Sequence, residues 1–328
     1  MKRKILVLLA GLLATSAAGA SWWYVRARAA AVEFPTEVLA MLPSDVSVVA
    51  YADMAALRNE PLVQRLAALA PPTTQGTDYA NFVAATGFEY QRDLDRIVLA
   101  SSSASTAPVP PAHTLVIADG RFDQEKIEAY ALRAGKKETR NGHTVYTTPT
   151  ATPGKTTAFT FLSAGRLAIA DGGDISSVLE QRSLSPADTG LQDQISRVAG
   201  APIFLVARPQ AIVSATGGAT RVATPLDNLR WVNLAARPDG DKVTLSVEGS
   251  CDTPEQAKQI AATLELLKGI SGGMLANPKN TGNMPPETAK AISQMIQAAQ
   301  VSTEASRVRL LMGIDTAALG GAATPSKP

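Results

Sequence analysis

The sequence is poor in the side chains that most metal sites and stacking surfaces use. It has one cysteine and two histidines in 328 residues, and aromatic side chains make up 5% of the chain. A single cysteine excludes an intramolecular disulfide. The two histidines lack the H-x-x-x-H or H-E-x-x-H spacing of a zinc motif, and so few aromatic residues argue against a base- or sugar-stacking platform. We therefore expect no metal centre and no cofactor.

An excess of charge of one sign is also lacking. The 31 Lys and Arg residues nearly balance the 29 Asp and Glu residues, which leaves a formal net charge of +2. Nucleic acids are bound by clustered Lys and Arg side chains, and no dense basic run follows the first few residues. We therefore expect no nucleic-acid partner. The hydrophobic content of 45% is ample for a packed core.

The N-terminal segment carries the strongest signal. Three basic residues at 2–4 precede an uncharged stretch at 5–25, which is long enough for a helix to cross a bilayer. The aromatic run at 22–24 is typical of a membrane interface. We favour a retained, single-pass anchor in the inner (cytoplasmic) membrane, which contacts the lipid bilayer through residues 5–25 and leaves the C-terminal domain extracytoplasmic. The alternative is a signal peptide cleaved after Ala20, with the domain secreted to the periplasm.

The stretch PTATPGKTT at 149–157 partly matches a phosphate-binding loop, because Gly154, Lys155 and Thr156 read G-K-[ST]. Pro149 stands where the motif requires its first glycine, and proline has no N–H to offer a phosphate. The flanking residues are β-rich, whereas the motif must open a helix. We interpret the stretch as a hairpin loop and expect no nucleotide binding.

The two halves of the chain repeat one pattern. Residues 94–134 and 229–268 each read as strand, loop, strand, glycine-containing turn and helix, with Gly120 aligned with Gly249. A T-x-x-Q capping box at 253–256 marks the start of the second helix. We expect that the two halves superpose as related lobes.

The repeat predicts an α+β fold of two similar lobes of antiparallel-rich sheet, with helices mainly on one side, preceded by one N-terminal transmembrane helix. Strands 114–118 and 243–247 should be equivalent, and helices 123–134 and 253–268 should share a side. The expected segments are an anchor or signal segment at 1–30, a first lobe at 31–187, a second lobe at 188–319 and a disordered tail at 320–328.

Turn signals place further elements. Asn141-Gly142 is a strong tight-turn signal before a strand. A helix is expected near 286–300 because its apolar residues share one face, and two β-rich runs at 300–305 and 307–315 follow it as a hairpin. The polar run LSPADTG at 184–190 is the expected linker between the lobes.

A resemblance adds to this reading. The stretch LPSDVSVVAYADMAALRNEPLVQRL at 42–66 resembles the start of uncharacterised, membrane-anchored bacterial envelope proteins, in which an LP-x-D turn leads to a strand, a D-x-x-x-L-R stretch and a helix. The GRFD at 120–123, after a β-run, fits the same type. The resemblance covers residues 42–180, and the second half loosely. It implies an extracytoplasmic α+β fold with one N-terminal anchor, and it implies no activity.

The remaining candidates for chemistry are acidic residues that each follow a β-run. They are Asp53, Asp119, Asp123 and Asp171. Paired carboxylates could serve a glycosidase, but Asp at strand ends also caps helices and forms turns. Glu248 and Asp252 occupy repeat positions that match Asp119 and Asp123, as structural roles would. We expect Cys251 to be a buried apolar residue, and His143 to be an exposed strand-end residue. His113 lacks a zinc-motif partner, as His143 does. We predict no catalytic residue.

The sequence thus predicts a non-enzymatic, single-pass envelope protein whose extracytoplasmic domain binds a partner, such as another envelope protein, or has a structural role. The alternative is a membrane-tethered or secreted hydrolase that uses the strand-end carboxylates. A deep cleft with two facing carboxylates would favour the hydrolase, and a closed surface with an apolar patch would favour association.

Overall fold

The computed structural model describes the chain in several ranges. These are residues 34–60, 77–102, 113–150, 152, 154–172, 174–180, 186–215, 228–240, 242–276 and 286–315. The expected anchor at 5–25 and the expected tail at 320–328 lie outside the described residues. Within the described ranges, no helix combines the length and the apolar character that a membrane crossing requires.

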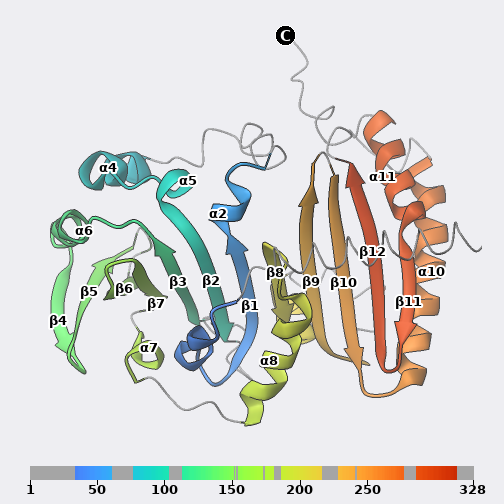
Figure 1. Ribbon diagram of the computed structural model, residues 1–328, viewed down its shortest axis with the longest axis horizontal. Helices are drawn as coiled ribbons and strands as arrows, with labels where there is room; N and C mark the ends of the chain where they lie inside the picture. Colours follow the sequence, from blue (N-terminus) through green and yellow to red (C-terminus); the bar gives the residue numbers. More distant parts are fainter. Residues whose placement is uncertain are drawn as a thin grey trace, which may run out of the picture.

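The described strands form one 12-stranded antiparallel sheet, in the order β11-β12-β10-β9-β8-β1-β2-β3-β7-β6-β5-β4 (Figure 1). Their bounds are β1 Val46–Asp53, β2 Leu94–Ser102, β3 His113–Gly120, β4 Lys136–Arg140, β5 His143–Pro149, β6 Thr156–Ser163, β7 Arg166–Asp171, β8 Ile203–Ala207, β9 Leu229–Asp239, β10 Lys242–Cys251, β11 Gln300–Glu304 and β12 Arg307–Asp315. The fold is α+β, as expected.

The strand order is mirrored about the central pair β1–β8. Outward from this pair, β1-β2-β3-β7-β6 on one side corresponds to β8-β9-β10-β12-β11 on the other, and β5-β4 extends the first half. Residues 114–118 lie in β3 and residues 243–247 in β10, each in the third strand outward. The topology therefore follows the repeat. The expectation of two lobes needs one correction, because direct pairing of β1 with β8 makes them halves of a single sheet.

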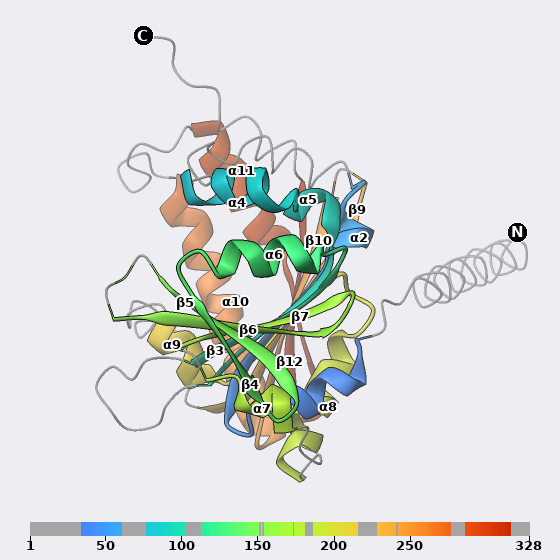
Figure 2. The ribbon, with the colours of Figure 1, turned by 90° about the vertical axis from the view of Figure 1, so that its left-hand side faces the viewer.

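Helices cover both faces of the sheet, so the expectation that they lie mainly on one side is wrong (Figure 2). Their bounds are η1 Thr36–Met41, α2 Met54–Leu57, α4 Thr77–Thr86, α5 Tyr90–Asp93, α6 Gln124–Ala131, α7 Ser176–Glu180, α8 Pro186–Val198, α9 Pro209–Ala215, α10 Pro254–Ala276 and α11 Pro286–Ala298. Strand β7 shows the reason, since its neighbouring residues Leu167 and Ala168 point to opposite faces and are both buried. A strand buried on both faces requires cover on both.

Three hydrophobic clusters define the two faces. The largest cluster packs η1, α7 and α8 against the face of the sheet that carries Val49, Ile117 and Phe204. We name this face of the sheet the η1 face. On the opposite face, the α6 face, one cluster lies under α6 and a second lies under α10. The register partners can be followed from β3 through β2, β1, β8 and β9 to β10, and they show which residues of β10 lie on the α6 face. Helices α6 and α10 therefore lie on the same side of the sheet, as predicted.

Local signals in the sequence are confirmed at several turns and caps. The Thr253 hydroxyl accepts a hydrogen bond from the Gln256 N–H, and the Gln256 side chain accepts one from the Thr253 N–H. Asn141 and Gly142 have φ of 49° and 80° in the β4–β5 turn, which only a few residue types adopt readily. The β11–β12 hairpin is also present. The linker expected at 184–190 is instead helical from residue 186, where α8 begins.

Candidate binding site

Two of the four acidic candidates lie in a row of alternating charge on the η1 face. Asp53, Arg96, Asp119 and Arg166 are register partners on the neighbouring strands β1, β2, β3 and β7. Arg166 holds Asp119 with two hydrogen bonds of 2.6 and 3.0 Å. A carboxylate oxygen of Glu37 in η1 lies 3.1 Å from a nitrogen of the Arg166 guanidinium. The hydrogen bond to Asp119 raises the pKa of Arg166 above its usual value. Asp119 is therefore held by a cation and does not face a second carboxylate.

Asp53 has a second, local role, and the two remaining acidic candidates lie outside the row. Asp53 also caps α2 by accepting from the Ala56 N–H at 2.7 Å, and Asp123 caps α6 by accepting from the Lys126 N–H at 3.2 Å. Asp171 is exposed at the end of β7. The hydrolase alternative therefore gains no paired carboxylates from these four residues.

The histidines and the cysteine are scattered. His143 is partly exposed at the start of β5 and pairs with Arg140 across the β4–β5 turn, and the side chain of His113 lies outside the described residues. Cys251 is buried in the cluster under α10, and burial raises the pKa of its thiol. Within the described ranges, no group of three His, Cys, Asp or Glu side chains is placed to hold a metal ion.

The G-K-T stretch is part of a hairpin, as predicted. Gly154 has φ of 77°, the Thr150 N–H donates to the Lys155 carbonyl at 3.0 Å, and Thr156 opens β6 opposite Pro149. These contacts join two antiparallel strands, whereas a phosphate-binding loop leads from a strand into a helix.

An apolar cavity lies on the α6 face of the first half. This inner cavity has a volume of about 330 Å³. Its lining consists of Phe82, Phe88, Leu94, Ile97, Val116, Ala118, Phe122, Ile127, Thr157, Phe159, Leu167 and Ile169. Thr157 is the one residue of this lining that carries a polar side chain. Such a cavity takes up apolar groups, because it offers polar groups no replacement for their hydration.

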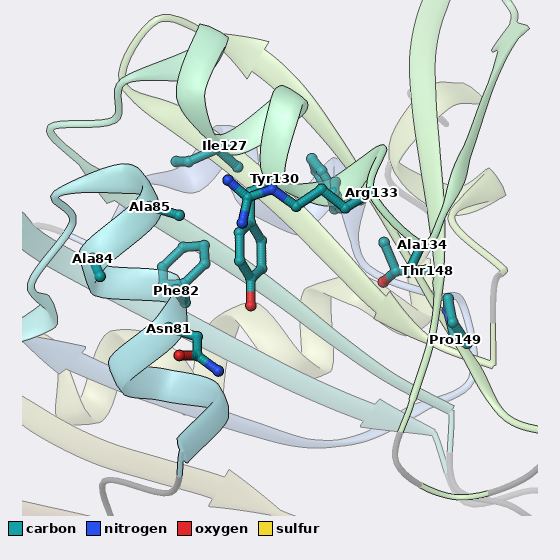
Figure 3. Close-up of a pocket in the computed structure, with 12 residues that line it drawn as sticks. Asn81, Phe82, Ala84, Ala85, Ile127, Tyr130, Arg133, Ala134, Thr148 and Pro149 are labelled. Atoms are coloured by element: carbon teal, nitrogen blue, oxygen red, sulfur yellow. The ribbon is translucent and has the colours of Figure 1, made fainter.

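A second, outer cavity adjoins the first between α4, α6 and the end of β5. It has a volume of about 890 Å³ and shares Phe82, Ile127 and Phe159 with the inner cavity. Figure 3 shows the rings of Phe82 and Tyr130 between the two helices, with centroids 5.4 Å apart in an edge-to-face arrangement. We name the two cavities together the α4–α6 site.

Apart from Thr157, the polar groups of the α4–α6 site line the outer cavity. Asn81, Arg133 and Thr148 line it (Figure 3), and the Arg133 guanidinium lies 5.2 Å from the centre of the Tyr130 ring. Behind the lining, Tyr146 stacks on Phe159 at 4.9 Å. Burial and a hydrogen bond to Glu128 raise the pKa of Tyr146 to about 12. The site thus combines an apolar interior with an outer part that adds a few polar groups and one guanidinium.

Sequence reasoning did not find this site. The low aromatic content argued against a stacking platform, but the fold gathers five of the seven phenylalanines around the cavities: Phe82, Phe88, Phe122, Phe159 and Phe161. They come from α4, β6 and two loops that are far apart in sequence. The placement of Phe159 and Phe161 under α6 depends on which face β6 turns to that helix. The alternation in TTAFTFLS was the one available signal.

The comparisons with known proteins show the fold alone. No protein-family model matches the sequence, and no curated protein matches it. The structure of TP0453 in crystal form III is similar with a TM-score of 0.51 and 12% identity, over 87% of this chain and 96% of that chain. Crystal forms IV and I of TP0453 give TM-scores of 0.48 and 0.44 at 12% and 11% identity, over 86% and 87% of this chain and 94% and 95% of theirs, too low to support an argument. The chain thus has a TP0453-like α+β fold.

Proposed function

We propose that this chain is a membrane-anchored envelope protein whose extracytoplasmic domain binds an apolar or amphipathic molecule in the α4–α6 site. The observation that carries the proposal is the inner cavity of about 330 Å³, whose lining is apolar except for Thr157. Ligand sites typically have volumes of ~300 to ~1,000 Å³ with a few polar groups that orient the ligand. Asn81 and Arg133 in the outer cavity are such groups.

The same lining favours binding over hydrolysis. Among the described residues, the walls of both cavities contain no Asp, Glu, His, Cys or Lys side chain, and Tyr130 and Arg133 are their only ionisable groups. A hydrolase with two catalytic carboxylates would need such groups within hydrogen-bond reach of the substrate. The strand-end carboxylates lie elsewhere, with Asp119 held by Arg166 on the opposite face. A binding domain therefore accounts for the geometry better than the hydrolase alternative does.

The sequence supports the location. Residues 5–25 are uncharged and long enough to cross a bilayer, and the basic residues at 2–4 favour a cytoplasmic N-terminus. An anchored domain would meet apolar molecules at the outer surface of the inner membrane. Mass spectrometry of the purified chain and carbonate extraction of membranes test this, since an anchored chain keeps residues 1–20 and stays in the membrane fraction. A soluble species that begins at Ser21 would favour the secreted alternative.

Solvent extraction of the purified chain tests the binding function. We expect the full chain, purified in mild detergent, to release an apolar or amphipathic molecule that mass spectrometry detects in near-equal molar amount. Ala118 is buried and lines the inner cavity, so Ala118→Leu should lower the released amount several-fold by occupying the space. Circular dichroism controls for folding. Equal amounts from both proteins, or none from the natural chain, would contradict the proposal.

A further inference from the structure

The sheet is open, so it ends in two edge strands, β4 and β11 (Figure 1). An edge strand presents unpaired N–H and C=O groups that can bind another strand, and proteins commonly block this with charged side chains. The two edges of this sheet differ in that respect. Strand β4 reads KKETR, with four charged residues out of five, and β11 reads QVSTE, with one.

Strand β4 opposes pairing with its own copy. In the antiparallel register that aligns all five residues with a second β4, Lys136 stands opposite Arg140 of the second copy. Glu138 then stands opposite Glu138 of the second copy. Like charges that face one another destabilise a strand pair. Every pair of charged residues in this register is therefore repulsive, and Lys137 faces the uncharged Thr139.

Strand β11 has no such obstacle. The same full register places Gln300 opposite Glu304, Val301 opposite Thr303, and Ser302 opposite its own equivalent. No like charges face one another, and the Gln300 amide can donate to the Glu304 carboxylate. Ser302, Thr303 and Glu304 are exposed, so this part of the edge is accessible.

The hydrogen-bonding groups of β11 also fit this register. Glu304 and Arg307 close the two-residue turn at 305–306 as register partners, so the N–H and C=O groups of Glu304 point to β12. The alternation along a strand then directs those of Val301 and Thr303 outward. These are the two residues that face each other in the β11–β11 register, and they would form four main-chain hydrogen bonds about a twofold axis at Ser302.

We propose that β11 is a self-association edge, at which two copies of this chain pair antiparallel through residues 300–304. The occupant is a second copy because the strand is complementary to itself in charge and in hydrogen bonding. The twofold axis is perpendicular to the sheet, so the α6 face of both copies lies on the same side. The proposal is independent of the α4–α6 site, which lies in the other half of the sheet.

Cross-linking tests the register directly. In the dimer Ser302 faces its equivalent as a non-hydrogen-bonded pair, with Cα atoms about 4.5 Å apart, a separation that suits a disulfide. Two Thr303 residues would be about 8 Å apart by strand geometry, which is too far for a disulfide. In detergent under mild oxidation, Ser302→Cys should form covalent dimers at least ten times faster than the matched control Thr303→Cys. Cys251 is buried and should not react. Equal rates, or no dimer from Ser302→Cys, would overturn the proposal.

Two further variants test association without a cross-link. Thr303→Pro removes an outward N–H and leaves the pairing with β12 intact, and Ser302→Lys places two lysines face to face at the axis. Light scattering should show the natural full chain as a dimer, and each variant should weaken the dimer about tenfold or more. Thr139→Pro, at the matching outward position of β4, should leave the dimer unchanged. A monomeric natural chain, or a dimer insensitive to both β11 variants, would contradict self-association through β11.

Discussion

The two halves of the sheet share one frame but differ in what covers the α6 face. In both halves the third strand outward from the β1–β8 pair ends beside a bulge in the second strand. Strand β3 ends beside a bulge in β2 with Asp95 as the extra residue, and β10 ends beside a bulge in β9 with Arg230 as the extra residue. Both halves also place an acidic residue of this strand against an arginine of the next strand, Asp119 with Arg166 and Glu248 with Arg309.

The cover above this frame differs in length and in fit. Helix α10 has 23 residues, and its Ala257 and Ile260 pack with Cys251 and Val308 in a cluster of buried residues. Helix α6 has 8 residues, and it shares the cover with α4 over the inner and outer cavities. The same arrangement of strands thus supports a buried cluster under α10 in one half and the α4–α6 site in the other. Every residue that lines these two cavities belongs to the first half, so the α4–α6 site depends on the cover of that half.

The largest expected difference between the halves is at the aligned glycines. A Cβ added at Gly120 would lie 2.4 Å from the Asp93 carbonyl oxygen, which belongs to the backbone, and one added at Gly249 would lie 2.7 Å from a terminal methyl of Leu229. A side chain can move aside more easily than a backbone carbonyl. We expect Gly120→Ala to lower the free energy of unfolding by about 3 kcal/mol and Gly249→Ala by about 1 kcal/mol in urea titrations. Equal losses would show that the two sites are equally tolerant.

The two ion pairs should differ next. The side chains of Arg166 and Asp119 are 19% and 16% exposed, whereas Arg309 is 53% exposed beside a Glu248 that is 8% exposed. Asp119→Asn leaves a mostly buried guanidinium with Glu37 as its remaining carboxylate, and we expect a cost of about 2 kcal/mol. Glu248→Gln should cost about 1 kcal/mol or less, since Arg309 is open to water and one Glu248 oxygen has no hydrogen-bond partner among the described residues. The same urea titrations measure both, and a larger loss for Glu248→Gln would reverse the comparison.

A smaller difference concerns acid sensitivity. Asp93, just before β2, corresponds to Asn228 before β9, so only the first half has a titrating group at this position. Hydrogen bonds from Arg92 and from the Glu89 N–H hold the pKa of Asp93 below its usual value. A carboxyl whose pKa is lowered by folding stabilises the native state above its unfolded pKa, about 3.9, and this contribution is lost as the pH falls through the lower folded pKa.

We therefore expect Asp93→Asn to destabilise the protein by about 1 kcal/mol at pH 7. The gap to the natural chain should shrink steadily below about pH 4. Urea titrations from about pH 2.5 to about pH 7, a range that includes the unfolded pKa of about 3.9, measure this gap. Asp171 is exposed, so Asp171→Asn serves as the control and should show no such convergence. A gap that stays constant with pH would show that the Asp93 charge does not stabilise the fold.

Much of the frame could be predicted from the sequence, because it depends on local signals. The strands around Gly120 and Gly249, the capping box at 253–256 and the Asn141-Gly142 turn need only short-range patterns. The joining of two lobes into one sheet could not be predicted, since it depends on the β1–β8 pairing of strands about 150 residues apart. The α4–α6 site was missed for the same reason, because α4 brings Phe82 to strands from other parts of the chain.

The most direct test of the account uses matched variants on the α6 face of the two halves. Val116 of β3 lines the inner cavity, and Leu245 occupies the equivalent position of β10. The full chain is treated with a photoreactive alkyl diazirine, and the labelled residues are mapped by mass spectrometry. We predict labelling of residues that line the inner cavity, lost in Val116→Phe and retained in Leu245→Phe. Cavity labelling that persists in Val116→Phe, or label found mainly on α10, would contradict a binding site confined to the first half.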